Sequence, residues 1–94
     1  MSTTTIDQPM IVVPFVHTNG TSRAALLEHL ERSYRALAEA TQALKNGAPN
    51  ARDYYPEPGR YELAREQHFR RLRTLADLQD ELVAEGESIQ RAGR

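Results

Sequence analysis

The sequence predicts an all-α fold, a two-helix antiparallel hairpin with an extended N-terminal arm that oligomerises to complete its core. Three observations predict it. Two segments of about 25 residues repeat apolar side chains at alternating spacings of three and four, as helices packed against each other do. A proline- and glycine-rich stretch separates them. Of 94 residues, 39% are hydrophobic, and twelve of these are alanine, so the core is sparse.

The N-terminal part of the chain is predicted to contain no helix. Residues 1–9 are rich in serine and threonine and are expected to be flexible. Residues 10–17 are expected to form an extended arm, because Ile11–Val16 is a run of β-branched and aromatic residues. Pro14 has no backbone N–H, so the arm is either an edge strand or a non-strand segment.

The first helix is predicted over residues 22–46. Thr21 or Ser22 offers an N-cap, and two acid-before-base pairs four residues apart, from Glu28 and Glu31, support the helix surface. Gly47 is expected to end the helix in a left-handed conformation. The residues of the predicted seam are Leu27, Leu30, Tyr34, Leu37, Thr41 and Leu44.

The second helix is predicted over residues 60–88, after a loop at 47–59 that holds three of the five prolines. Gly86 is expected to fray or end it, which leaves 91–94 as a tail and makes 10–90 one helical hairpin domain. The residues of its seam are Tyr61, Ala64 or Arg65, His68, Leu72, Leu75, Leu78 or Gln79, Leu82 and Ile89.

Two helices alone bury one stripe each, whereas ordering the backbone costs about 1–2 kcal/mol per residue. A chain of this size also buries only about 60–65% of its unfolded surface. We therefore expect a homo-oligomer; the sequence leaves open whether the arm lies across a neighbouring subunit or on its own hairpin. The residues expected to be available for such contacts lie off the seams: Leu26, Leu63, Phe69 and Val83.

Composition excludes several function classes. There is no cysteine, and therefore no disulfide, thiolate metal site or cysteine nucleophile. No apolar run is long enough to span a membrane and no secretory signal is evident, so a cytoplasmic location is expected. A net charge of −1 argues against nucleic acid as a partner. No catalytic triad, metal cluster or cofactor motif is visible, so no enzyme activity, metal or cofactor is predicted.

The loop end of the hairpin is the first candidate binding site. Tyr54 and Tyr55 are suited to stacking on a nucleobase, and Arg52 and Arg60 to holding phosphate. Helix 60–88 also places its arginines in its first half, against the preference of the helix macrodipole, as an anion-binding end would. The alternative interpretation is structural: the tyrosines close the hairpin as a hydrophobic plug, and the arginines pair with neighbouring glutamates.

Residues 17–23 are the second candidate site. His17 and Asn19 offer directional hydrogen bonds and Arg23 a cation beside free amides at a helix start. The alternative is an ordinary Asn-Gly turn followed by a capped helix. In a hairpin, Arg23 and Arg52 lie at opposite ends, on the order of 35 Å apart. They share a site only across a subunit boundary, unless the loop folds well back.

Three stretches of the chain, Val13–Arg23, Asn50–Pro56 and the Ala64, His68 and Leu72 helix, resemble small helical proteins encoded by tailed bacteriophages. The resemblance spans residues 11–85 and implies no particular activity. The architecture is also similar in outline to phage anti-defence sponge proteins, which are oligomeric helical hairpins that bind cyclic nucleotide signals at subunit boundaries. That second resemblance is one of fold type only.

These observations together predict a non-enzymatic phage accessory protein that binds and sequesters a small anionic, nucleotide-like signal of the host cell cytoplasm at subunit boundaries. The predicted ligand-binding residues are Tyr54, Tyr55, Arg52, Arg60, Arg23, His17 and Asn19. The alternative is a protein–protein adaptor, or an inhibitor of a host protein, that acts through exposed helix faces and the apolar arm.

Overall fold

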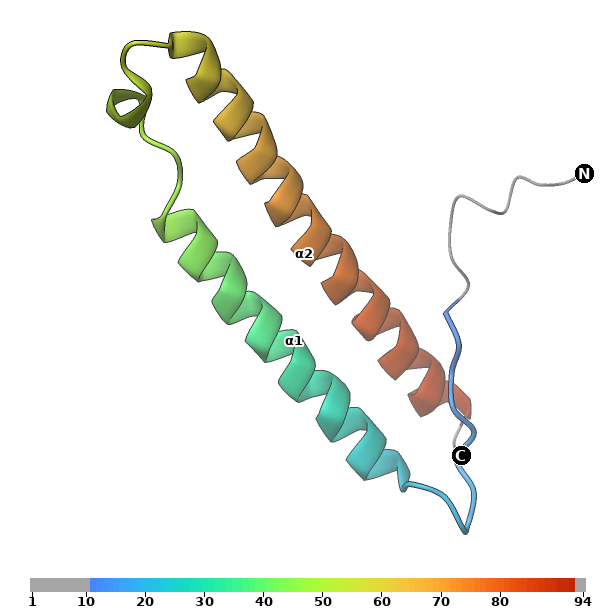
Figure 1. Cartoon of the computed structure of the whole chain (residues 1–94). Coiled ribbons are helices and arrows are strands. Elements are labelled where there is room, and N and C mark those ends of the chain that lie inside the picture. The colour runs from blue at the N-terminus through green and yellow to red at the C-terminus, as the bar shows by residue number, and fades with distance from the viewer. Residues whose placement is uncertain (1–10, 93–94) are drawn as a thin grey trace, which may run out of the picture.

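The computed structural model describes residues 11–92, which form two long helices joined at one end (Figure 1). Helix α1 spans Arg23–Asn46, the short 3-10 helix η2 spans Ala51–Tyr54, and α2 spans Pro58–Ala92. Residues 11–92 contain no β-strand, so the predicted all-α class is confirmed. The predictions for residues 1–9, Met10 and the last two residues lie outside the described part of the chain.

Helix α1 begins and ends within a residue of its predicted bounds. The Ser22 side chain accepts a hydrogen bond of 3.1 Å from the Ala25 N–H, which satisfies one backbone donor of the first turn. At the other end the prediction for Gly47 was wrong. Its φ is −105°, and its N–H donates to the carbonyls of Ala43 and Leu44, so the helix ends without a left-handed residue.

Helix α2 is longer than predicted at both ends. It starts at Pro58 rather than residue 60, because proline needs no N–H partner in the first turn and its φ is already helical. It also continues through Gly86 to Ala92, so the predictions that Gly86 frays or ends it and that 91–92 belong to a tail were wrong. Gly86 faces Leu27 and Leu30 of α1, and packing of the last turns against α1 offsets the low helix propensity of glycine.

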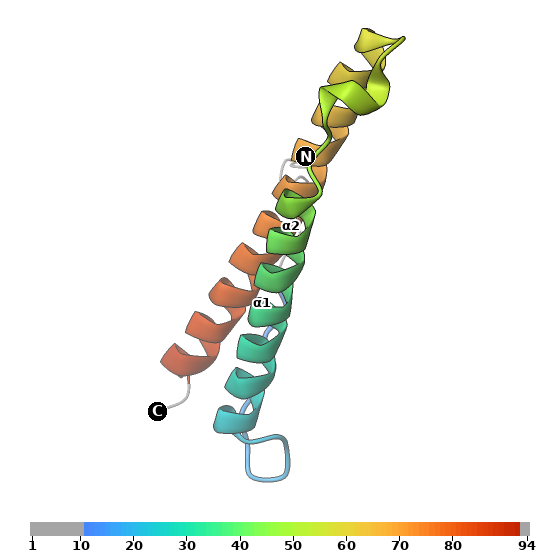
Figure 2. The same cartoon turned by 90° about the vertical axis from the view of Figure 1, so that its left-hand side faces the viewer.

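The contacts between the helices pair the start of α1 with the end of α2. Leu30 lies beside Gly86, and the Gln79 side-chain amide donates a hydrogen bond of 3.3 Å to the Tyr34 carbonyl. At the other end, Tyr54 of η2 lies against Tyr61. Figure 2 shows the result from the side: the helices lie next to each other, and residues 47–57 form the tip.

The core is thin along the whole hairpin. Ile89, 1% exposed, is the only buried hydrophobic side chain among residues 11–92, and His68 is the only buried polar one. Most of the predicted seam is half-buried, although Tyr34 and Leu78 are exposed. Leu63, Phe69 and Val83 lie exposed off the seams as expected, whereas Leu26 is half-buried.

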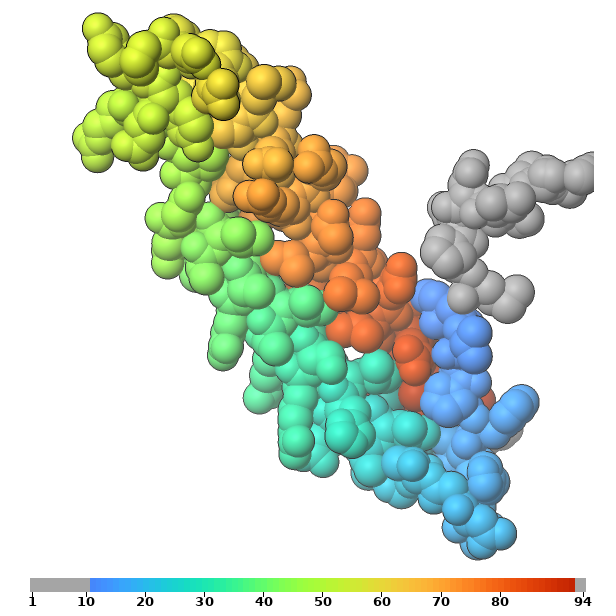
Figure 3. Space-filling view, in the orientation of Figure 1, coloured from blue at the N-terminus to red at the C-terminus, as the bar shows by residue number. Residues whose placement is uncertain are grey.

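The N-terminal arm, residues 11–17, has no regular secondary structure. Figure 3 shows it against the C-terminal end of α2. Ile11 and Val13 are half-buried, while Val12 and Phe15 are 81% and 89% exposed. The arm therefore covers part of its own hairpin and leaves Val12 and Phe15 almost entirely in water, with Val16 partly so.

The two ion pairs predicted on α1 are present. Arg32 contacts Glu28 at 3.0 Å and Arg35 contacts Glu31 at 2.7 Å, with all four side chains exposed. Such surface pairs each stabilise a helix by only about 0.3–0.5 kcal/mol. They favour α1 as a helix but do not hold it against α2.

Replacing Gly86 with alanine should stabilise the protein. A Cβ at this position would lie 3.7 Å from Leu30 Cδ1 and 3.8 Å from Leu27 Cδ2, which is ordinary contact. Glycine inside a helix costs about 0.5–1 kcal/mol relative to alanine, so Gly86→Ala should raise the free energy of unfolding by that amount. Urea unfolding at fixed protein concentration measures it. Gly86→Leu is the control, because its longer side chain must displace both leucines and should destabilise; a loss with alanine contradicts this packing.

Candidate functional site

The tip of the hairpin is held in shape by local hydrogen bonds. The Asn50 side chain accepts from the Arg52 N–H at 3.0 Å and so caps η2. The Glu57 N–H donates to the Tyr54 carbonyl at 2.9 Å, and the Arg60 N–H donates to the Glu57 carbonyl at 2.9 Å, which leads the chain into α2. The backbone that carries the aromatic residues is therefore ordered by its own turn chemistry.

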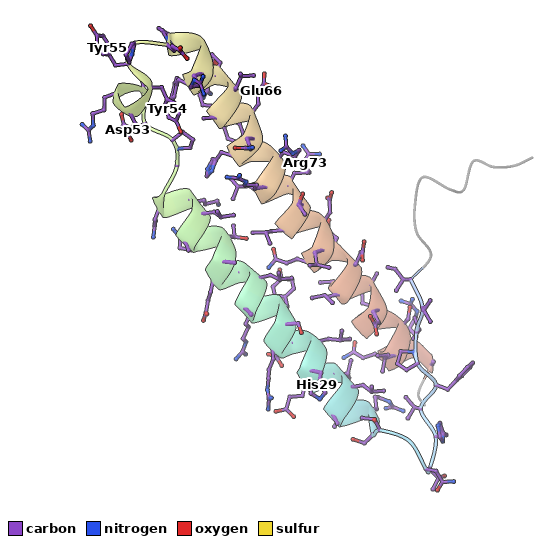
Figure 4. All side chains as sticks on the ribbon, in the orientation of Figure 1. His29, Asp53, Tyr54, Tyr55, Glu66 and Arg73 are labelled. Atoms are coloured by element: carbon purple, nitrogen blue, oxygen red, sulfur yellow. The ribbon has the colours of Figure 1, made fainter. Side chains whose placement is uncertain are left out.

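An open pocket of about 670 Å³ lies at this tip. Tyr54 is half-buried and its ring lies 6.0 Å from that of Tyr61, centroid to centroid, with the planes tilted by 42°. Tyr55 is 78% exposed, and Figure 4 shows it at the extreme end of the hairpin. The residues that line the pocket are Ala51, Arg52, Tyr54, Tyr55, Pro58 and Tyr61.

The predicted cations of the tip differ in position. Arg52 lines the pocket beside the tyrosines. Arg60 does not line it, and its Nε donates to Glu57 Oε1 at 2.7 Å. Arg65, one turn further along α2, lies with its guanidinium carbon 5.9 Å from the Tyr61 ring centroid and 5.7 Å from that of Phe69. Pairing with Glu57 is one of the contacts that the structural interpretation expected.

A second, smaller pocket of about 340 Å³ adjoins the first and shares Tyr61 with it. Three basic side chains reach it, one from the end of α1 and two from α2. Its lining residues are Lys45, Ala48, Pro49, Tyr61, Arg65, His68, Phe69 and Leu72. None of the three basic residues was among the predicted site residues. A signal was available, because 61, 65 and 68 share one face of a helix.

His17, Asn19 and Arg23 lie at the opposite end of the hairpin (Figure 1). The Gly20 N–H donates to the His17 carbonyl at 3.1 Å, and a Cβ on Gly20 would meet the His17 ring at 2.7 Å, so the imidazole folds over the glycine. Arg23 Nε is buried and has no hydrogen-bond partner within residues 11–92. The 24 residues of α1 separate this end from the tip by about 36 Å.

A single chain therefore brings together three of the seven predicted residues, Arg52, Tyr54 and Tyr55, in one pocket. Aromatic rings beside guanidinium groups can hold a flat ring by stacking and a negative charge by hydrogen bonds. In the described range of the chain, no three His, Asp or Glu side chains gather as a metal site. No helix there is both long and apolar enough to cross a bilayer.

Comparisons with known proteins place no further residue in this site. No protein-family model, no curated protein and no solved structure matches the chain.

Proposed function

We propose that this protein is a non-enzymatic binding protein that holds a small anionic, nucleotide-like molecule at the tip of the hairpin. The observation that carries the proposal is the shared pocket of Arg52, Tyr54 and Tyr55, closed on its inner side by Tyr61. In the proposed complex the nucleobase stacks on the exposed Tyr55 ring, and Arg52 donates to a phosphate oxygen.

The adjoining pocket supports the same ligand class. Lys45 and Arg65 supply positive charge on the far side of Tyr61 from Arg52, although Arg65 also contacts Glu62 at 3.3 Å. A ligand with a ring on one side and phosphate groups on the other would use both pockets. Stacking of one base on an aromatic side chain contributes about 1–3 kcal/mol, so the tyrosines would supply a measurable share of the affinity.

Holding such a molecule without changing it amounts to sequestration. Following the similarity in outline to phage anti-defence sponge proteins, the proposed role is an anti-defence accessory that lowers the concentration of a host nucleotide signal. We also propose that the protein acts as a homo-oligomer, with His17, Asn19 and Arg23 of one copy completing the site of another. Within residues 11–92 a single hydrophobic side chain is buried, which supports self-association, because two lone helices gain little from burial.

Titration calorimetry tests the ligand. The wild-type protein is titrated with ATP, cyclic AMP, cyclic di-AMP and inorganic phosphate; at least one nucleotide should bind more tightly than phosphate alone. Tyr55→Ala and Arg52→Ala should each weaken that binding at least tenfold, with the oligomer mass unchanged in native mass spectrometry. Tyr55→Phe keeps the ring and should retain most of the affinity, and Arg32→Ala removes an exposed arginine of α1 far from the tip.

Equal weakening by Arg32→Ala and Arg52→Ala would mean that charge alone, and not the pocket, attracts the nucleotide. No binding of any nucleotide, together with native mass spectrometry of protein from its own host that shows no retained small molecule, would contradict the proposed function.

The second candidate function is a protein–protein adaptor or inhibitor of a host protein. Large apolar side chains in water favour it, chiefly Phe15 at 89% and Leu63 at 65% exposure. If this function is correct, Phe15→Asp or Leu63→Asp should abolish co-purification of a host partner. Tyr55→Ala should then have no effect, which separates the two functions.

A further inference from the structure

Charges along α2 are separated into two blocks. Residues 60–73 carry five arginines and two glutamates, whereas residues 77–87 carry five acidic residues and no basic one. Within one chain this order opposes the helix macrodipole, which favours acids at the start and bases at the end. Between two copies that lie antiparallel, the same order is attractive, because each basic half meets an acidic half.

A row of apolar side chains follows one side of the same helix. Phe69, Ala76 and Val83 are spaced by seven residues, and all three are exposed, Phe69 at 57% and Val83 at 44%. Phe69 lines a pocket with Lys45 of α1. Val83 lines a separate groove, between the start of α1 and the end of α2, with Glu31, which lies fourteen residues before Lys45 on α1. Residues 69 and 83 on α2, like residues 31 and 45 on α1, are fourteen apart, which is close to four full helical turns. The row therefore stays on one side of the hairpin. Nothing within residues 11–92 covers it.

We infer that α2 pairs antiparallel with α2 of a second copy about a two-fold axis at Ala76. This register places Phe69 against Val83 of the second copy and Ala76 against its own counterpart. Beside this apolar row, the same register brings Arg73 of one copy close to Asp80 of the second copy. Figure 4 shows Arg73 on the side of α2 turned away from α1, where a second helix can reach it.

The register satisfies the requirement of a two-fold interface that one patch be complementary to itself. Phe69 and Val83 lie symmetrically about Ala76, and Arg73 and Asp80 lie almost so. The small side chain at the axis lets the two backbones approach closely. One pair opposes association, since Glu66 faces Glu87 of the second copy. A basic residue in place of Glu66 would turn this repulsion into attraction, which makes the pair a test of the register.

The paired helices would also complete the proposed site. Tyr61 precedes Ala76 by fifteen residues and Arg91 follows it by fifteen, about 22 Å along the helix in each direction. The tip of one copy is therefore level with the termini of the other. This brings Arg52 and Tyr55 of one copy to the height of Arg23 of the second. The interface rests on the self-association proposed above, but not on the identity of the ligand.

Single-cysteine cross-linking tests the register without any ligand, because the natural chain has no cysteine. Ala76→Cys should form a covalent dimer on mild oxidation, since the axis brings residue 76 of both copies together. A mixture of Phe69→Cys and Val83→Cys should cross-link as a mixed pair. Leu63→Cys is the matched control: it is also exposed on α2 but lies on another side of the helix, and it should stay largely monomeric on a denaturing gel.

Charge variants test the same register in solution. In sedimentation velocity, Arg73→Glu should raise the dimer dissociation constant at least fivefold, and combining it with Asp80→Arg should restore the wild-type value. Glu66→Lys should lower the dissociation constant, because it places a base opposite Glu87. Circular dichroism on each variant establishes that the helices are retained.

A wild-type chain that sediments as a folded monomer at 50 μM would overturn the inference, as would Leu63→Cys cross-linking as fast as Ala76→Cys. A tighter dimer with Arg73→Glu would also overturn it. If the protein binds no nucleotide but Ala76→Cys still cross-links, the proposed function alone would be overturned. Nucleotide binding by a protein that fails to cross-link at Ala76 would overturn this interface alone.

Discussion

Truncation of Ile89 to alanine should have the largest effect of any single change on stability. Its side chain is 1% exposed, near the end of α2 where the arm meets the hairpin. Burial in the interior makes such a truncation cost about 2–5 kcal/mol, the sum of lost transfer energy and a cavity. For a domain of this size that loss corresponds to a fall in melting temperature of roughly 10 °C or more.

Thermal unfolding by circular dichroism at fixed protein concentration measures the effect. Leu63→Ala is the matched control, because that leucine is 65% exposed and its truncation should change stability by only about 0.5 kcal/mol or less. Similar melting temperatures for Ile89→Ala and the wild type would show that packing around the C-terminal end of α2 contributes little to folding. A large loss at Leu63 would instead show that its exposed side chain is covered in solution.

Replacement of Tyr61 by alanine should have the largest effect on the candidate site. The Tyr61 ring contacts Tyr54, lies under the Arg65 guanidinium and lines both pockets. Its removal would merge the pockets and leave η2 without its main contact on α2. If stacking and shape contribute about 1–3 kcal/mol, nucleotide affinity should fall about 5- to 150-fold.

Calorimetry with the nucleotide that binds the wild type measures this loss. Tyr61→Phe is the control, since it keeps the ring, the contact with Tyr54 and the cation–π geometry while removing the hydroxyl. Phenylalanine should retain affinity within about threefold if the ring acts through stacking. An equal loss with phenylalanine would mean that the hydroxyl, and not the ring, contacts the ligand.

The charge order of α2 links the two proposals. Arginines near the start of a helix are unfavourable for that helix, and the first turn of α2 has no acidic residue to offset them. The sequence-based interpretation assigned this cost to an anion at the tip. In an antiparallel dimer, the acidic half of the second copy would also offset this unfavourable placement of the arginines. The two explanations are compatible because pairing leaves the tip pocket at the edge of the dimer.

Much of the fold was predictable because its determinants are local. The three-and-four spacing of Leu27, Leu30 and Tyr34 marks a helix surface wherever it occurs. Ser22 caps the first turn through its own side chain. The bounds that failed depend on tertiary contacts. Propensity predicts a helix end at Gly86, yet this residue faces Leu27 and Leu30 of α1 and lies inside a helix that continues to Ala92.

The candidate site was predictable only in part, for the same physical reason. The sequence by itself determined that tyrosines and arginines gather in the connection between two helices, since neighbours in the chain must also be neighbours in space. Only the tertiary structure decided that Arg52 faces the tyrosines while Arg60 holds Glu57, and that Lys45 and His68 join them from two helices. Pairing of side chains distant in sequence depends on how the helices pack, and a periodic pattern specifies which face packs but not which side chains meet there.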